Sequence, residues 1–137
     1  MRLAHLRDPD RLRILRLELK MPRENTIPEQ LCQKMLDELH IAYLDHKRVG
    51  SVCQPDFIIP RRKIAIFVDG DFWHCNPEVY PDGPMCETQR RVTTKDRRQE
   101  SRLRELGWQI LRLWEKDLKT HPEMCKGRIW SVIGAES

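Results

Sequence analysis

Hydrophobic and polar positions follow two different periods along this chain, and the changes of period divide it into helices and strands. Between residues 28 and 40 the apolar positions recur at helical spacing. These positions are Leu31, Cys32, Met35, Leu36 and Leu39. Thr26 and Glu29 stand where a capping box places its two residues. The pattern therefore predicts an amphipathic helix that begins next to Thr26.

Three strands are predicted after this helix. A short one covers residues 41–45, and two apolar, β-branched runs follow at 56–59 and 63–69. The two runs are separated by Pro60, Arg61 and Arg62 only, so we expect them to form a hairpin.

The C-terminal half predicts further helices and one more strand. Thr93 or Thr94 is a suitable cap for a polar helix that ends before Gly107. The nearly continuous apolar run at 108–114 predicts a strand that is buried on both faces. Residues 118–134 are expected to form a loop and a short helix, which packs Ile129, Trp130 and Ile133 on the core.

The order helix, strand, strand, strand, helix, strand indicates an α/β fold with a mixed central β-sheet flanked by helices. That order is also the core of the restriction-endonuclease-like fold. We expect a single domain at 26–137, because 137 residues with 39% apolar content suffice for one core. Residues 1–25 are expected to form a helical arm, since leucines recur along residues 1–20 and Pro22 ends or kinks that helix.

Charge and cysteine content narrow the class of protein. The net charge is +4, yet residues 88–128 alone hold 12 Lys and Arg against 6 Asp and Glu. Such a local excess suits binding to a phosphate backbone, although a solvated helix face explains a charge run equally well.

No run has the roughly 18 apolar residues of a membrane span, so we expect a cytoplasmic protein without membrane contact. The chain has five cysteines, an odd number with no two close together in the sequence. In a cytoplasmic protein they indicate free thiols or metal ligands.

Acidic and histidine side chains stand at strand ends, where a strand interior does not need them. Asp56 opens one predicted strand, His74 follows the end of the next, and Asp96 comes 22 residues after His74. Acid, histidine and acid in a basic chain suggest metal-assisted phosphodiester hydrolysis. Each residue also has a structural interpretation. Asp56 would bind backbone amides, His74 would be a packed polar residue, and Asp96 would cap a helix beside Thr93.

Several motifs resemble the very-short-patch repair (Vsr) endonucleases, bacterial enzymes that nick DNA beside a T:G mismatch. They are Pro55-Asp56-Phe57, Phe67-Val-Asp-Gly70, Phe72-Trp73-His74, Lys95-Asp96-Arg97 and Leu106-Gly-Trp-Gln-Ile-Leu-Arg-Leu-Trp-Glu115. The order of Glu29, Asp56, His74 and Asp96 also resembles the Glu-Asp-x-His-Asp pattern that this family shares with phage homing endonucleases.

The resemblance implies roles for these residues. Asp56 and the main-chain carbonyl of Val68 would bind Mg²⁺, Glu29 would bond waters on the metal, and His74 would be the general base, oriented by Asp96. Phe72 and Trp73 would wedge between bases of double-stranded DNA; two core aromatics in a bent loop are the alternative. The cationic side chains expected on the DNA are those of Arg90, Arg91, Lys95, Arg97 and Arg98.

A structural Zn²⁺ site is a further implication, with Cys75 and Cys86 as ligands together with Cys125 or His121. Lys116 stands where the resembling enzymes have a cysteine. The resulting hypothesis is a Mg²⁺-dependent DNA endonuclease that nicks one strand at mismatched or distorted sites, in a prokaryotic or phage setting at the nucleoid. Two alternatives stay open: a homing or restriction-type endonuclease with another target, and an inactive DNA-binding module.

Overall fold

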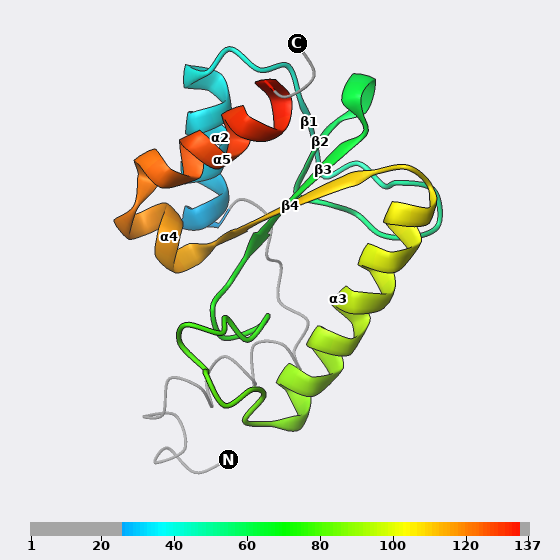
Figure 1. Ribbon diagram of the computed structural model, residues 1–137, viewed down its shortest axis with the longest axis vertical. Coiled ribbons are helices and arrows are strands. Elements are labelled where there is room, and N and C mark those ends of the chain that lie inside the picture. Colours follow the sequence, from blue (N-terminus) through cyan, green and yellow to red (C-terminus); the bar gives the residue numbers. More distant parts are fainter. Residues whose placement is uncertain (1–25, 135–137) are drawn as a thin grey trace.

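The computed structural model describes residues 26–134. The expected helix at 1–20 and the arm at 1–25 lie outside the described residues. Within them, the chain forms α2 (Ile27–Glu38), β1 (Leu44–Asp45), β2 (Phe57–Ile59), the 3₁₀ turn η2 (Pro60–Arg62) and β3 (Ile64–Asp69). It continues with α3 (Glu87–Glu105), β4 (Gln109–Trp114), α4 (Glu115–Thr120) and α5 (Pro122–Gly134). The predicted order of elements is confirmed (Figure 1).

The four strands form one mixed sheet in the order β1-β2-β3-β4. β1 pairs antiparallel with β2, and β2 pairs antiparallel with β3 through the predicted hairpin. β3 and β4 are parallel, and α3 makes the crossover between them. The parallel pairing brings the carboxyl ends of β3 and β4 to the same edge of the sheet, because Asp69 is in register with Trp114.

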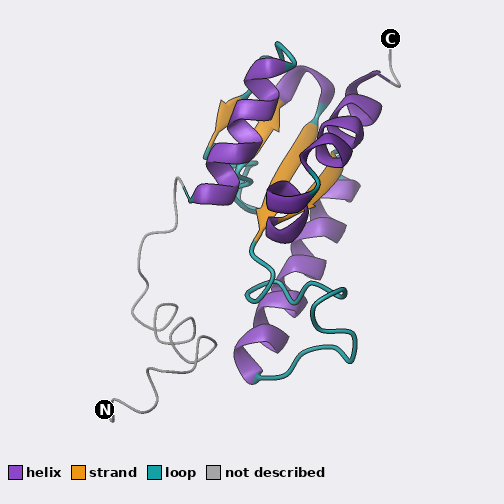
Figure 2. Cartoon of the chain, turned by 90° about the vertical axis from the view of Figure 1, so that its left-hand side faces the viewer, coloured by secondary structure: helices purple, strands orange, loops and turns teal. Residues whose placement is uncertain are grey.

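Helices cover the two faces of the sheet unequally. α2, α4 and α5 pack on one face, where Leu36, Leu118 and Ile129 meet Ile66 and Leu113. α3 covers the other face (Figures 1 and 2), and Leu103 of α3 is buried there against the sheet. The central strand β3 is consequently buried along most of its length, as its uninterrupted apolar sequence predicts.

The N-terminus of α2 follows the predicted cap. The hydroxyl oxygen of Thr26 accepts a hydrogen bond from the backbone N–H of Glu29 at 3.4 Å. The helix ends at Glu38, two residues before the predicted end.

Three predictions about the C-terminal half are wrong. α3 begins at Glu87 with Cys86 at the N-cap, so Thr93 lies inside the helix, where its hydroxyl donates to the carbonyl of Gln89. β4 is not buried on both faces, since Gln109 is exposed and burial alternates along the strand. Residues 118–134 are mostly helical rather than a loop and a short helix.

The packing predicted for that last segment is correct in part. Ile129 is fully buried and Ile133 packs against the same core. Trp130, however, is 57% exposed, because consecutive helical residues point about 100° apart and Ile129 takes the position that faces the core.

Candidate active site

The loop after β3 brings the predicted site residues to the edge of the sheet. It turns sharply at Gly70, and the N–H of His74 donates to the carbonyl of Gly70 at 3.1 Å. A Cβ atom at Gly70 would lie 3.2 Å from Cδ1 of Trp73, so a larger residue would press on the indole. The tight turn directs His74 back toward the sheet and α3.

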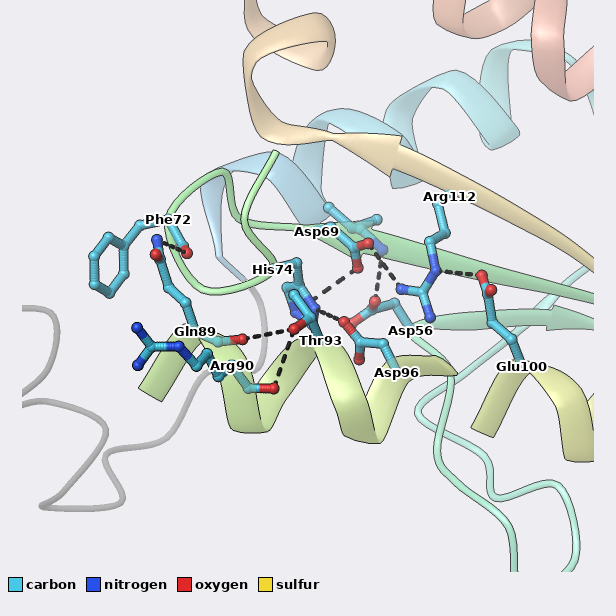
Figure 3. Close-up of polar contacts among 11 residues, drawn as sticks. Asp56, Asp69, Phe72, His74, Gln89, Arg90, Thr93, Asp96, Glu100 and Arg112 are labelled. Atoms are coloured by element: carbon cyan, nitrogen blue, oxygen red, sulfur yellow. Dashed lines mark hydrogen bonds and ion pairs between the residues drawn. The ribbon is translucent and has the colours of Figure 1, made fainter. Parts of the chain in front are cut away.

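His74 is paired with Asp96 from the middle of α3. Nδ1 of His74 lies 2.6 Å from Oδ2 of Asp96 (Figure 3). Asp96 is in the third turn of the helix, so it cannot act as a cap, and the structural interpretation that made it one is excluded. The pair leaves Nε2 of His74 as the nitrogen that accepts a proton.

A second carboxylate lies on the other side of the imidazole. Oδ1 of Asp69 is 3.8 Å from Nε2 of His74. Burial alone would lower the pKa of His74, but the hydrogen bond from Asp96 and the charges of Asp69 and Asp96 together raise it above its ordinary value. The imidazolium form is therefore stabilised on both sides.

Asp69 is itself held by a buried arginine that the sequence did not single out. Nη1 of Arg112 donates to Oδ2 of Asp69 at 2.8 Å, and Nε donates to Oε1 of Glu100 at 2.6 Å (Figure 3). The guanidinium also stacks 4.5 Å from the centroid of the Phe67 ring. Arg112 thus links β4 to β3 and α3 directly beneath His74.

Asp56 lies where β2 begins, beside the end of β3. The N–H of Val68 donates to Oδ2 of Asp56 at 2.7 Å. This bond agrees with the interpretation in which Asp56 binds a backbone amide, and the side chain of Glu29 also interacts with Asp56. Burial raises the pKa of Asp56 to about 7, and the nearby charges of Glu29 and Asp69 add to that shift despite the bond from Val68.

Glu29, Asp56 and His74 line one cleft of about 500 Å³. Val68, Asp69 and Trp73 contribute to its walls, whereas Asp96 supports His74 from behind and does not line the cleft. The structure therefore brings together all four residues that the sequence indicated. It adds the pairing of Asp69 with Arg112, two residues that stand within the quoted motifs but that nothing in the sequence brings together.

The two aromatic residues of the loop have different environments. Phe72 is 2% exposed, and its ring meets those of Trp73 and Tyr80 edge to face. Gln89 of α3 donates from Nε2 to the carbonyl of Phe72 at 2.8 Å. Phe72 is therefore a packing residue in this conformation, and the wedge prediction is left to Trp73, which is partly exposed in the cleft.

The predicted zinc ligands are not gathered in one place. Within residues 26–134, no three His, Cys, Asp or Glu side chains form a cluster that would hold a metal ion. Cys125 belongs to α5 and is buried in the core, while Cys75 lies in the loop after β3. His121 instead bonds the hydroxyl of Thr120 at 2.8 Å. The zinc set of Cys75, Cys86 and Cys125 is thus a prediction that the structure does not support, and all five cysteines are free.

The predicted DNA-binding cations all lie exposed on α3. Arg91, Lys95 and Arg98 have the spacing i, i+4 and i+7, so they form one stripe along the helix. Within the described part of the chain, no carboxylate lies within ion-pair distance of these three side chains or of Arg97, whereas Arg90 pairs with Glu87 at 3.3 Å. No helix of residues 26–134 is long and apolar enough to cross a membrane.

Comparisons with known proteins agree with this geometry. The solved catalytic domain of the homing endonuclease I-Bth0305I has a TM-score of 0.61 and 25% identity, over 79% of this chain and 94% of that domain. The mixed sheet with its flanking helices is accordingly a restriction-endonuclease-like fold. A sequence model described as "DNA mismatch endonuclease Vsr" matches residues 16–78.

Two nicking enzymes are among the relatives. Type II nicking enzyme V.HpaIIP of Haemophilus parainfluenzae is 32% identical, over 80% of this chain and 82% of that enzyme. Type II nicking enzyme V.NaeI of Lentzea aerocolonigenes is 32% identical over 69% of this chain, which spans 63% of V.NaeI. The chain belongs to the Vsr endonuclease family, and it is a DNA endonuclease.

Proposed function

We propose that this protein is a Mg²⁺-dependent endonuclease that cuts one strand of double-stranded DNA by hydrolysis of a phosphodiester bond. The observation that carries the proposal is the arrangement of the cleft. A half-buried carboxylate, Asp56, faces the same space as the imidazole of His74, which is paired with Asp96. Metal-assisted hydrolysis needs an anionic ligand for the cation and a base for the water on opposite sides of a phosphate.

The donor set in the cleft fits Mg²⁺. Asp56 and Glu29 offer hard carboxylate oxygens, and within residues 26–134 no Lys or Arg lies within ion-pair distance of Asp56. A bound cation would relieve the unfavourable burial that raises the pKa of Asp56 to about 7. Mg²⁺ keeps several waters and takes one or two protein carboxylates, so a site without three clustered side chains suits it better than it suits Zn²⁺.

Asp56 would hold the cation, with the main-chain carbonyl of Val68 and with Glu29 bonded to its waters. The bound cation supplies positive charge to the scissile phosphate and to the leaving oxygen. Nε2 of His74 accepts a proton from the attacking water as its oxygen bonds to phosphorus and the bond to the leaving oxygen breaks. Asp96 and Asp69 stabilise the imidazolium that results.

The stripe of Arg91, Lys95 and Arg98 on α3 would contact backbone phosphates of the bound duplex. Such contacts position the duplex without reading its sequence. Trp73 is the side chain that would contact the bases, because it lines the cleft beside His74.

A mismatched or distorted site is the proposed target. The family description names mismatches, and an unstacked base step costs less to open at a mismatch than in a paired duplex. Two labelled duplexes that differ only in a central T:G or C:G pair test this target, each incubated with and without Mg²⁺. We expect Mg²⁺-dependent cleavage of one strand of the T:G duplex. Equal cleavage of both duplexes would contradict the mismatch preference but not the nuclease chemistry.

A second candidate has specific support. The solved relative of the same fold is a homing endonuclease catalytic domain, which favours a sequence-defined target with the same chemistry. Cleavage of a plasmid library at a recurring matched sequence would select this candidate. DNA binding without any cleavage would instead identify an inactive DNA-binding module.

A further inference from the structure

His46 is a site residue that the sequence motifs do not indicate. β1 ends at Asp45, which pairs with Phe57, and the next residue continues this pairing. The N–H of His46 donates to the carbonyl of Asp56 at 3.1 Å. The backbone of His46 is thus fixed directly opposite the residue that we assign to the cation.

The side chain of His46 reaches across to the first turn of α2. Its Nε2 lies 3.4 Å from Oε2 of Glu29. The Glu29 side chain is 9% exposed, and that of His46 is 24% exposed. Glu29 lines the cleft together with Asp56, whereas His46 is not among the residues that line it.

The helix fixes the backbone of Glu29 but not the direction of its carboxylate. The Thr26 cap holds the backbone N–H of Glu29, whereas its carboxylate has three rotatable bonds. Glu29 and Asp56 both line the cleft, and their side chains lie close enough to interact. The imidazole of His46, 3.4 Å away, is a partner that can hold the Glu29 carboxylate in the direction of the cleft.

We propose that His46 is a positioning residue, which holds the Glu29 carboxylate toward the cation site at Asp56. The inference rests on the proposed Mg²⁺ chemistry and deepens it. His46 touches neither DNA nor the reacting atoms in this account, so it acts through Glu29. Removing a partner of this kind lowers metal affinity or activity about 10-fold to 100-fold.

The backbone of His46 guides the choice of variants. Its φ of 51° lies in the left-handed region, which asparagine tolerates better than most residues. His46→Asn therefore keeps the turn while its shorter side chain does not reach Glu29. His46→Gln is the conservative variant, because its amide N–H extends about as far as Nε2. His40 is exposed and has a φ of 57°, so His40→Asn is the matched control.

The first test compares Mg²⁺ binding by calorimetry with kcat and KM on a cleavable duplex. We expect His46→Asn to weaken Mg²⁺ binding and to lower kcat about 10-fold or more, with KM for DNA unchanged. His46→Gln should keep most of the Mg²⁺ affinity and most of kcat. His40→Asn should match the wild type in both quantities. Wild-type Mg²⁺ binding and kcat in His46→Asn, or equal losses in the Asn and Gln variants, would overturn the proposal.

A double-mutant cycle tests whether His46 acts through Glu29. If it does, His46→Asn combined with Glu29→Gln should be no slower than Glu29→Gln alone. Losses that multiply would show that His46 acts independently and would overturn the inference. Asp56→Asn distinguishes a failure of the proposed Mg²⁺ function from a failure of the role proposed for His46. Full activity in Asp56→Asn would contradict the proposed Mg²⁺ function itself, whereas an inactive Asp56→Asn beside an unaffected His46→Asn would contradict the role of His46 alone.

Discussion

Nδ1 of His74 lies 2.6 Å from Oδ2 of Asp96, although 22 residues separate the two in the sequence. The loop after β3 carries the imidazole, and the middle of α3 carries the carboxylate. The pairing fixes the ring, as the general-base role proposed for His74 requires. On the other side of the ring, Asp69 and Arg112 complete a charged layer between the sheet and α3.

The first prediction concerns the pH dependence of cleavage. The pKa of His74 is raised, and the base must be neutral, so kcat should rise with pH through a value above the ordinary 6.5. Asp96→Asn removes the hydrogen bond and charge that raise this pKa, so the rise should move to lower pH while Asp69 and Arg112 remain. The measurement is kcat against pH at saturating Mg²⁺, where the bound cation keeps Asp56 ionised.

His74→Ala is the control for this assignment, with an expected loss in kcat of about 10²-fold to 10⁴-fold. A pH profile that stays the same in Asp96→Asn would mean that another group activates the water.

The second prediction is that Asp56→Asn stabilises the metal-free protein while it abolishes cleavage. Folding raises the pKa of Asp56 from 3.8 to about 7. Between these two pH values the native state therefore holds a proton on Asp56 that the unfolded state releases. Stability from this group is present below pH 3.8 and is lost as the pH rises through about 7. Asparagine removes the buried charge and still accepts the bond from Val68. Thermal melting at pH 8 without Mg²⁺ should therefore give a higher Tm for Asp56→Asn than for the wild type. A lower Tm would contradict the burial argument.

The third prediction separates the two adjacent aromatic residues. Phe72 is buried against Tyr80, so Phe72→Ala should cost about 3–5 kcal/mol of stability. Trp73→Ala should cost much less stability and should weaken DNA binding by roughly 1–3 kcal/mol, the value of stacking on a base.

Melting and DNA titration on the same two variants check this difference. Unchanged DNA affinity in Trp73→Ala would end the wedge hypothesis. That result would also remove the strongest physical reason to expect that the protein recognises distorted DNA.

Local pattern predicted β2 and β3 well because each is a short apolar run with a clear break, whereas the strand predicted at 41–45 is reduced to Leu44–Asp45. The predicted runs 56–59 and 63–69 differ by one residue at most from β2 and β3. The start of α3 was misplaced because Cys86 makes no side-chain cap bond, whereas Thr93 looked like a cap. The site motifs at Asp56, His74 and Asp96 were also visible, since a charged residue at a buried strand end has few structural explanations.

The remaining parts of the site depend on contacts that no local pattern reveals. Arg112 sits in an apolar strand and finds Asp69 only because β3 and β4 pair in parallel. His46 finds Glu29 only because β1 pairs beside Asp56. The burial of Phe72 likewise requires Gln89, which a helix beginning at Thr93 would not include.

The most direct test of the account is the conversion of supercoiled plasmid by the wild type, His74→Ala and Asp56→Asn, each with Mg²⁺ and with chelator. All three proteins should first be shown to be folded and to bind DNA. The account predicts open-circular DNA from the wild type with Mg²⁺ alone, a much slower conversion by His74→Ala, and none by Asp56→Asn. Wild-type rates in either variant, or nicking that persists in chelator, would contradict the claim that this cleft hydrolyses DNA with a bound cation.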